Sequence, residues 1–214
     1  LMNEKAEAMG LTNTHFVNCT GLDDGENADE HLTTARDIAI MSRELLKHEK
    51  IKDYTTIWMD TVRNGEFGLS NTNKLVRFYD GTTGLKTGYT SAAGYCLSAS
   101  AEREGMELIA VVMHCASSTD RFESAKAMLN YGFSNFTLVD PLAGAQVRPV
   151  EVVLGKEEYV TLTAQDAGKV LLDKALAGAV SCAVEQEERV HAPVSKGQRL
   201  GTVTVTAGGR VIAE

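Results

Sequence analysis

Two strand-like runs, residues 94–100 (GYCLSAS) and 106–113 (MELIAVVM), are separated only by the polar stretch AEREG. Short runs rich in strand-forming residues, joined by a few polar residues that include glycine, predict a β-hairpin. The hairpin commits this part of the chain to an antiparallel sheet, and it restricts the fold more than any other feature. A second, shorter hairpin is predicted around Asn64 and Gly65, because Asn-Gly is a preferred turn pair.

One helix is expected before the long hairpin in the sequence and another after it. Thr34 followed by Asp37 resembles a capping box with a shorter acid, so a helix should begin there. Its apolar stripe is expected at Ile38, Met41, Leu45 and Leu46. After the hairpin, Asp120 is expected to cap another helix, with Glu123 three residues further on. The buried face of that helix should contain Phe122, Ala125, Met128 and Leu129.

The N-terminal residues resemble the last turns of a helix, with Gly10 in the position of a C-terminal capping glycine. The following stretch is rich in Asn, Asp, Gly and Thr, which predicts an ordered but irregular loop. His15 and His31 flank this loop, and we expect them to order it through hydrogen bonds.

The character of the sequence changes near Pro141, where short β-branched runs begin to alternate with turns. We therefore predict two domains, residues 1–140 and residues 141–214, of which the second is small and rich in β-strands. The pair Gly208-Gly209 between two strand-like runs predicts a hairpin in that domain.

Composition excludes several classes of function. The net charge is −8, which argues against nucleic acid as a partner, because phosphate binding needs clustered Lys and Arg. No apolar run approaches the roughly 20 residues needed to span a bilayer. The four cysteines lack the spacing of a zinc site, and no other metal or cofactor is expected. The acidic stretch LDDGENADE lacks the residue order of a calcium loop and is expected to be solvated.

The stretch GTTGLKTGYT (81–90) contains the most specific chemical feature, the triplet Lys86-Thr87-Gly88. Lys86 supplies a positive charge for a carboxylate, and Thr87 supplies a hydroxyl donor. Gly88 has no side chain, so a peptide could lie against the strand edge and pair with its backbone. This combination suggests acyl transfer at a C-terminal peptide bond.

Lys-Thr-Gly is also the third signature of the penicillin-binding proteins and serine β-lactamases. The sequence resembles one branch of them, the serine-type D-alanyl-D-alanine carboxypeptidases of low molecular mass. The resemblance rests on four stretches, MNEKAEAMGLTNTHFVNCTGLDD, TTARDIAIMSRELL, DGTTGLKTGYTSAAGYCLSASAEREGMELIAVVM and the helix near DRFESAKAMLNYGF, and it extends to APVSKGQRLGTVTV. It implies an α+β fold of the penicillin-binding and serine β-lactamase type, here incomplete, followed by a small all-β C-terminal domain.

The other two signatures of that family, Ser-x-x-Lys and Ser-x-Asn, do not occur in the 214 residues. We therefore expect the nucleophilic serine and its lysine base to lie upstream of Leu1, and we expect the 214-residue chain alone to be inactive. Loss of that upstream part would expose apolar surface, so the chain is expected to be unstable or to self-associate.

By resemblance, Lys86 and Thr87 hold the terminal carboxylate of the substrate, and the backbone N–H of Tyr89 is half of the oxyanion hole. Arg121, at the start of the last helix of this domain, is expected near the same carboxylate. The alternative for Arg121 is a position on a solvated helix face.

The implied reaction removes the terminal D-Ala from peptidoglycan stem peptides through a serine acyl-enzyme. The implied partners are the stem peptide and, for the complete enzyme, β-lactam antibiotics. The implied location is extracytoplasmic, with peripheral membrane association through a C-terminal anchor that the 214 residues do not contain. Two alternatives remain open, a non-catalytic or processed muropeptide-binding form, and a β-lactamase or esterase of the same superfamily.

Overall fold

A computed structural model describes residues 1–23, 25, 27–165 and 167–214. The chain forms two compact units, Leu1–Phe133 and Ser134–Glu214. The sequence-based boundary near residue 140 lies further along the chain. The structural division falls earlier because strand β6 (Phe136–Val139) pairs with β9 (Val170–Asp173) and so belongs to the second unit. Asp24 and Glu26 of the acidic stretch lie outside the described residues.

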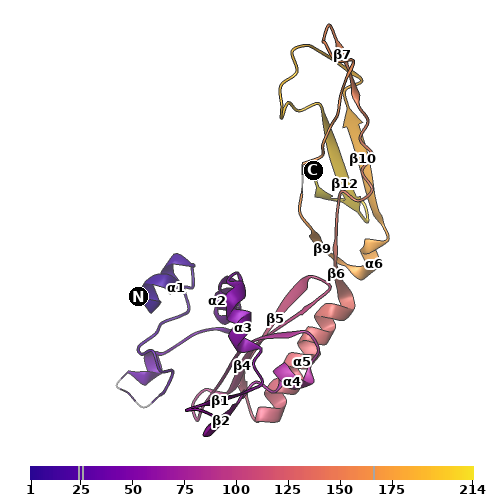
Figure 1. The fold of residues 1–214 in the computed structure, drawn as a ribbon. Helices are drawn as coiled ribbons and strands as arrows, with labels where there is room; N and C mark the ends of the chain where they lie inside the picture. The colour runs from indigo at the N-terminus through magenta and orange to yellow at the C-terminus, as the bar shows by residue number, and fades with distance from the viewer. Residues whose placement is uncertain (24, 26, 166) are drawn as a thin grey trace. The chain divides into compact units, whose positions relative to one another are not determined.

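The first unit contains a β-hairpin, a three-stranded sheet and several helices (Figure 1). Its helical elements are α1 (Met2–Ala8), η1 (Ala28–Glu30), α2 (Ala35–Leu46), η2 (Glu49–Ile51), α3 (Lys52–Thr55), α4 (Leu75–Phe78) and α5 (Ser118–Asn135), whose last two residues enter the second unit. Its strands are β1 (Met59–Val62), β2 (Phe67–Ser70), β3 (Thr82–Thr90), β4 (Gly94–Arg103) and β5 (Met106–Cys115).

The long hairpin predicted from the sequence is formed by β4 and β5, and β3 adds to it in the order β3-β4-β5, all antiparallel. The strands continue through most of the polar AEREG stretch, and the turn is confined to Glu104 and Gly105, both at positive φ. The Asn-Gly hairpin is also confirmed, because β1 pairs with β2 across a turn at residues 63–66.

Helices α2 and α5 cover opposite faces of the three-stranded sheet. Ser42 of α2 is hydrogen bonded to the buried Ser98 of β4 at 2.7 Å. Ala101 of β4 belongs to the other face, since successive strand residues alternate. Its cross-strand partner Leu108 lies directly against Gly132 of α5, where a Cβ would be 2.4 Å from Leu108 Cδ1. The side chains that line this second face or pack on it are buried, among them Leu97, Ala99, Ala101, Phe122, Ala125 and Leu129.

The helix signals were largely but not entirely correct. Thr34 caps α2, with its hydroxyl accepting from the Asp37 N–H at 3.1 Å. The carboxylate of Asp37 accepts from Thr14 at 2.7 Å. Leu46 is buried as predicted, whereas Leu45 is 42% exposed.

The predicted cap of α5 was wrong. Asp120 lies in the first turn of the helix, and its own N–H donates to the hydroxyl of Ser117 at 3.1 Å. Ser117 therefore caps the helix in place of Asp120. The prediction failed because Asp120 is preceded by two Ser residues and a Thr, each of which can also cap a helix. Met128, predicted on the buried face, is 48% exposed.

The N-terminal region is held together by backbone and side-chain hydrogen bonds. Gly10, at φ 71°, ends α1, with its N–H donating to Glu7 and the Leu11 N–H donating to Ala6. This is the Schellman arrangement that glycine favours. In the irregular loop, His31 Nδ1 accepts from the Val17 N–H at 3.3 Å, as predicted for this histidine. The expectation for His15 is met only through its backbone, which forms a bridge with Leu32.

The second unit consists of short strands and one four-residue helix, α6 (Lys174–Ala177). One sheet has the order β10 (Val180–Gln186), β12 (Gly201–Ala207), β13 (Arg210–Ala213), and the predicted Gly-Gly turn joins the last two. A second has the order β11 (Arg189–His191), β7 (Val150–Val153), β8 (Tyr159–Val160), in which β11 and β7 are parallel. The all-β character of this unit is therefore confirmed apart from α6.

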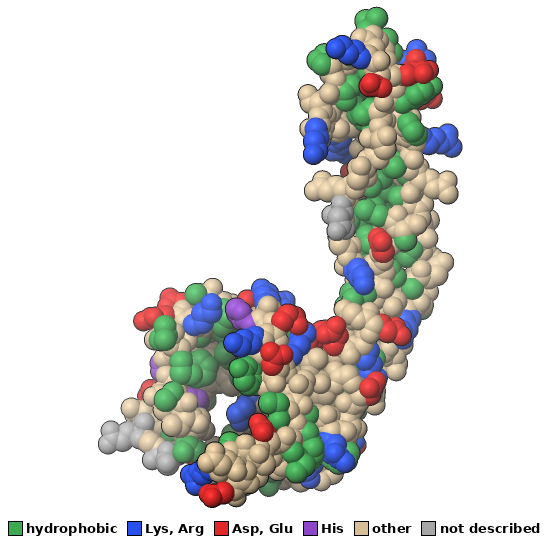
Figure 2. Space-filling view, in the orientation of Figure 1, with side chains coloured by type: hydrophobic (Ala, Val, Ile, Leu, Met, Phe, Trp, Pro, Cys, Tyr) green, Lys and Arg blue, Asp and Glu red, His purple; other side chains and the backbone are tan. Residues whose placement is uncertain are grey.

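Basic and acidic side chains are interspersed on the visible face of each unit (Figure 2). In the part of the chain that the structure describes, no helix is long and apolar enough to cross a membrane. The described residues also contain no group of three or more His, Cys, Asp or Glu that could hold a metal ion.

Candidate functional site

The Lys-Thr-Gly triplet lies in the second half of β3, which is an edge strand of the three-stranded sheet. Lys86 pairs with Ser98, Thr87 with Leu97 and Gly88 with Cys96, so one side of β3 faces β4. The other side has no partner strand among the residues that the structure describes. A strand edge with one unpaired side can add an extended peptide.

The side chains of the triplet point to both faces of the sheet. Lys86 and Gly88 belong to the face covered by α2, together with Ser98, and both are exposed. Lys86 Nζ donates to the carbonyl of Thr87. Thr87 belongs to the α5 face and is only 8% exposed. Its hydroxyl lies 2.7 Å from the hydroxyl of Thr72, which fixes its position.

Arg121 is brought to the triplet by the first turn of α5. Its guanidinium Nη1 donates to the carbonyl of Gly88 at 3.1 Å and to that of Cys96 at 3.3 Å. The residue is 7% exposed, and its Nε has no hydrogen-bond partner although it is buried. The solvated helix face considered for Arg121 is therefore wrong. The structure brings Arg121 into contact with Gly88 of the triplet, and the expected role of Arg121 at the terminal carboxylate stays a prediction.

Tyr89 extends the site beyond the triplet. Its ring is 57% exposed and lies 4.3 Å, between centroids, from the ring of its cross-strand partner Tyr95. The guanidinium carbon of Arg121 lies 5.4 Å from the Tyr95 ring. Aromatic pairs and cation–π contacts of this kind each contribute about 0.5 to 1.5 kcal/mol. The two rings and Arg121 thus hold the ends of β3 and β4 together next to the triplet.

Several residues that position the site carry no signal in the sequence. Asn73 is 2% exposed and donates to the carbonyl of Gly84 at 3.0 Å. Thr72 contacts Thr87 as described. Thr72 and Asn73 both lie in the stretch NTNK, which predicts only a turn. Their contribution depends on the turn being folded back against β3, and nothing local in the sequence indicates that contact.

The arrangement combines an exposed cation, an unpaired strand edge and a buried guanidinium at one end of β3. Lysine and arginine are the usual partners of a carboxylate, and backbone N–H groups can stabilise a developing oxyanion. The site can therefore hold the C-terminal end of an extended peptide.

The fold and this site define a class of protein. The structure resembles penicillin-binding protein 5 from Haemophilus influenzae, with a TM-score of 0.69 and 31% identity over 99% of this chain and 61% of that one. It also resembles penicillin-binding protein D2 from Listeria monocytogenes in its cefotaxime-bound form, with a TM-score of 0.57 and 31% identity over 62% of this chain and 53% of that one. The α+β architecture is that of the penicillin-binding proteins.

Residues 1–117 match the D-alanyl-D-alanine carboxypeptidase family, and residues 133–214 match the C-terminal domain of penicillin-binding protein 5. The chain belongs to the D-alanyl-D-alanine carboxypeptidase family.

Two curated relatives match the whole chain. The chain is 38% identical to the D-alanyl-D-alanine carboxypeptidase DacF from Bacillus subtilis and covers 55% of that protein. It is 32% identical to the D-alanyl-D-alanine carboxypeptidase DacC from Escherichia coli and covers 53% of it. The chain thus spans about half the length of the curated relatives it matches.

Proposed function

We propose that the complete protein is a serine-type D-alanyl-D-alanine carboxypeptidase that removes the terminal D-Ala from peptidoglycan stem peptides. In this proposal the 214-residue chain supplies the substrate clamp on β3, and the nucleophile lies upstream of Leu1. Leu1–Phe133 then forms the C-terminal part of the catalytic domain, and Ser134–Glu214 forms the small β-rich domain that follows it.

The observation that carries the proposal is the convergence of Lys86, Gly88 and Arg121 at one strand edge. The exposed Lys86 lies on the α2 face of β3, and the buried Arg121 of α5, which covers the opposite face, contacts the Gly88 carbonyl. A stem peptide that ends in D-Ala-D-Ala presents one carboxylate next to the bond to be broken. In this proposal Lys86 binds that carboxylate and orients the bond for attack, while Arg121 holds the Gly88 backbone in place.

In the proposed reaction, the serine oxygen attacks the carbonyl carbon of the penultimate D-Ala. The serine proton passes to the lysine base and then to the leaving amine, so the amide bond breaks and free D-Ala departs. Water then hydrolyses the ester. The N–H of Tyr89 would donate to the oxyanion in both steps, and loss of one such donor typically costs about a hundredfold or more in rate.

β-Lactam antibiotics are the second proposed ligand class. Solved relatives from Listeria monocytogenes contain cefotaxime or ampicillin, and the present chain shares their fold over 62% of its length. We also propose that the complete protein acts outside the cytoplasm, since its relatives are D-alanyl-D-alanine carboxypeptidases and peptidoglycan, the proposed substrate, is extracytoplasmic. Peripheral attachment through a C-terminal anchor belongs to the same proposal.

The test is to purify the complete protein and to measure D-Ala release from a peptide ending in D-Ala-D-Ala. Replacement of Lys86 by Ala should lower kcat/KM roughly ten- to hundredfold, the usual effect of losing a hydrogen bond to a charged group. Lys50→Ala is the matched control, because Lys50 is also an exposed lysine and is the middle residue of η2. It should leave kcat/KM unchanged.

Acylation by a labelled penicillin provides the second measurement. The complete protein should be labelled, whereas the 214-residue chain alone should not. Absence of D-Ala release and of labelling in the complete protein would favour the non-catalytic muropeptide-binding alternative. Rapid release of hydrolysed penicillin would favour the β-lactamase alternative.

A further inference from the structure

Strand β3 contains an extra residue just before the Lys-Thr-Gly triplet. Thr82 pairs with Ala101 and Gly84 pairs with Ser100, so Thr83 has no partner of its own in the ladder. An extra residue on one strand of an antiparallel pair is a β-bulge. Bulges re-aim the side chains that follow them, because the alternation of the strand shifts by one residue.

The bulge determines the faces on which the triplet lies. Thr82, opposite Ala101, belongs to the α5 face, and its hydroxyl contacts the carbonyls of Leu75 and Tyr79. Without the extra residue, strict alternation from Thr82 would place Lys86 on that same α5 face. With the bulge, Lys86 instead shares the α2 face with its partner Ser98. The orientation of the proposed clamp therefore depends on Thr83 remaining outside the ladder.

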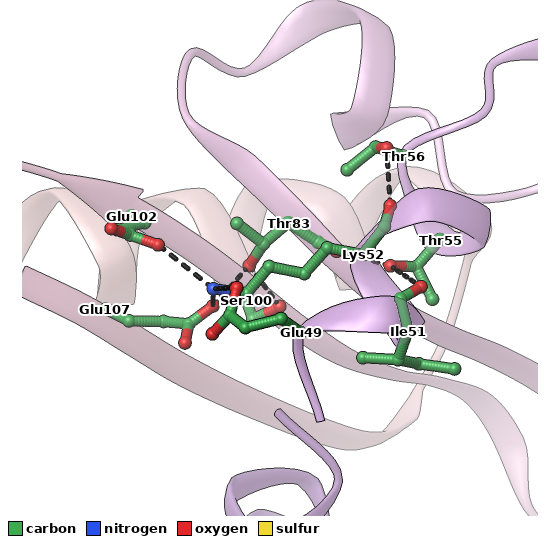
Figure 3. Close-up of polar contacts among 9 residues, drawn as sticks. All are labelled: Glu49, Ile51, Lys52, Thr55, Thr56, Thr83, Ser100, Glu102 and Glu107. Carbon is green, nitrogen blue, oxygen red and sulfur yellow. Dashed lines mark hydrogen bonds and ion pairs between the residues drawn. The ribbon is translucent and has the colours of Figure 1, made fainter. Parts of the chain in front are cut away.

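The side chain and the backbone of Thr83 are both held. Its hydroxyl oxygen lies 2.8 Å from a carboxylate oxygen of Glu107 and 2.7 Å from the hydroxyl of Ser100 (Figure 3). Its carbonyl accepts from the Thr55 hydroxyl of α3 at 2.5 Å. Three contacts from β5, β4 and α3 thus meet at the one residue of this stretch that lacks a ladder partner.

Glu107 is itself held by Lys52, the first residue of α3. Lys52 Nζ lies 3.5 Å from Glu107, 3.1 Å from Glu102 and 3.4 Å from Glu49 (Figure 3). The Lys52 side chain is 18% exposed, whereas that of Glu102 is 41% exposed. Burial lowers the pKa of Lys52, but the hydrogen bond to Glu102 and the charges of Glu107 and Glu102 outweigh it, and the pKa is raised above its usual value. Lys52 therefore stays charged and keeps the Glu107 carboxylate in place.

We propose that Glu107 is a positioning residue for the Lys86-Thr87-Gly88 site, and that it acts by fixing the β-bulge at Thr83 with the help of Lys52. Glu107 does not touch the substrate in this proposal. Its effect passes through the Thr83 hydroxyl to the register of β3, and through that register to the direction of Lys86. The inference rests on the proposed function for its kinetic consequence, but the bulge and its contacts are independent of it.

The experiment uses the complete protein and four substitutions, two that weaken the Glu107–Thr83 contact and two that leave it intact. Thr83→Val removes the hydroxyl at constant shape, and Glu107→Gln removes the charge that Lys52 holds. Glu102→Gln is the matched control, because the Glu102 carboxylate also binds Lys52, whereas the Thr83 hydroxyl contacts Glu107 and Ser100. Thr83→Ser keeps the hydroxyl and should therefore keep its contact with Glu107.

The first readout is the separation of KM from kcat in D-Ala release. Thr83→Val and Glu107→Gln should raise KM roughly fivefold or more, because a displaced Lys86 holds the terminal carboxylate less well. Thr83→Ser and Glu102→Gln should stay within about twofold of the unchanged protein. A purely structural defect would reduce the amount of folded enzyme, so kcat would fall while KM stayed constant. That result would overturn the proposal.

The second readout is amide hydrogen exchange in a peptide that covers residues 82–90, which needs no enzymatic activity. Exchange should be at least severalfold faster in Thr83→Val and Glu107→Gln than in Glu102→Gln. Equal exchange in all three variants would refute the role of the bulge even if the protein were an active carboxypeptidase. If the unchanged protein releases no D-Ala, the proposed function fails, and the exchange comparison still decides whether Glu107 holds β3.

Discussion

Arg121 is charged and buried. The stability of the folded state therefore depends on how many of its guanidinium N–H groups have hydrogen-bond partners. Two carbonyls, those of Gly88 and Cys96, accept from the same nitrogen, while Nε lacks a partner. A buried donor without a partner costs about 1 to 3 kcal/mol. The site therefore tolerates a destabilising group next to the strand edge where the substrate is proposed to bind, as functional sites often do.

Replacement of Arg121 by Lys should lower the free energy of unfolding by about 1 to 3 kcal/mol. A lysine cannot reproduce the planar guanidinium, so it leaves at least one of the two carbonyls without a donor. Urea unfolding of the complete protein measures the loss. Arg36→Lys, on the exposed surface of α2, is the control and should change the free energy by less than about 0.5 kcal/mol. Equal effects of the two substitutions would contradict this use of Arg121.

The cysteines should differ in reactivity. Burial raises the pKa of the Cys115 thiol, and the nearby Cys96 and Asp120 raise it further against the opposing charge of Arg121. Cys19 is exposed. Because the thiolate is the reactive form, iodoacetamide at about pH 8 should modify Cys19 well before Cys115. Mass spectrometry of labelled peptides over time tests this order. Faster labelling of Cys115 than of Cys19 would contradict the raised pKa of the Cys115 thiol.

At the scale of single residues, the sequence indicated Lys86, Thr87, Gly88, Tyr89 and Arg121 but could not indicate how they are held. Arg121 was expected near the terminal carboxylate of the substrate, and it lies in contact with Gly88. The roles assigned to these residues remain predictions. Thr72, Thr83 and Glu107 were not identified, because each acts through a contact between distant parts of the chain, and their types are common on any surface.

At the scale of elements, the cap of α5 shows how neighbouring signals compete. Ser117, Ser118, Thr119 and Asp120 are all residue types that cap helices, and the sequence offers no means of choosing among them. The Glu123 three residues after Asp120 favoured Asp120 as the cap. In the structure this Glu pairs with Lys126 at 2.6 Å and plays no part in capping.

Ser117→Ala should destabilise the first unit by about 1 kcal/mol, the usual cost of losing a helix cap. Asp120→Asn should cost only a few tenths of a kcal/mol, because Asp120 contributes chiefly through the helix dipole. Thermal unfolding of both variants of the complete protein distinguishes the two roles. A larger loss for Asp120→Asn would restore the cap predicted from the sequence.

The attachment of α3 to the sheet through Lys52 predicts a dependence on pH. The pKa of Lys52 is raised in the folded state above the usual 10.5, so its pairing is fully present below about pH 10.5 and is lost as the pH rises through the folded value. The thermal midpoint of the unchanged protein should therefore exceed that of Lys52→Met at neutral pH. The difference should shrink above about pH 10.5, and a difference that persisted there would exclude the charge as its cause.

The hairpins and their turns were predictable because their signals are local, namely alternation, Asn-Gly and Gly-Gly. The two bulges of the β3-β4-β5 sheet, at Thr83 in β3 and opposite Cys96 in β5, were not. They occur where side chains are small and both faces of the sheet are covered. In the run SASA of β4, for example, the polar Ser98 and Ser100 are buried as well as the two alanines. With no contrast between apolar and polar faces, the pattern does not reveal a shift of one residue.

At the scale of the whole molecule, the sequence predicted two domains and the all-β character of the second. It could not predict the parallel pairing of β11 with β7, because the two strands are joined by a long connection. It also placed the boundary after β6, since the strand follows α5 directly and its partner β9 lies more than thirty residues away in the sequence. Non-local pairing of this kind leaves no local signal.

The first unit exposes apolar side chains that predict association of the isolated chain. All residues of the β1–β2 hairpin are exposed, including Met59 at 68% and Phe67 at 53%. Phe78 of α4 is 69% exposed and packs edge-on against Trp58, which precedes β1. Hydrophobic side chains are visible on the surface of both units in Figure 2. Apolar patches of this kind favour contact with another protein surface.

The 214-residue chain should therefore show a mass above that of a 23.1 kDa monomer in light scattering, rising with concentration. Phe67→Ser together with Phe78→Ser should reduce the association, because both substitutions remove exposed aromatic surface without touching the core. Tyr159→Ser, at an exposed position of the second unit, is the control and should leave the mass unchanged if association occurs through the first unit. A stable monomer at all concentrations would show that the exposed apolar residues are too dispersed to form an interface.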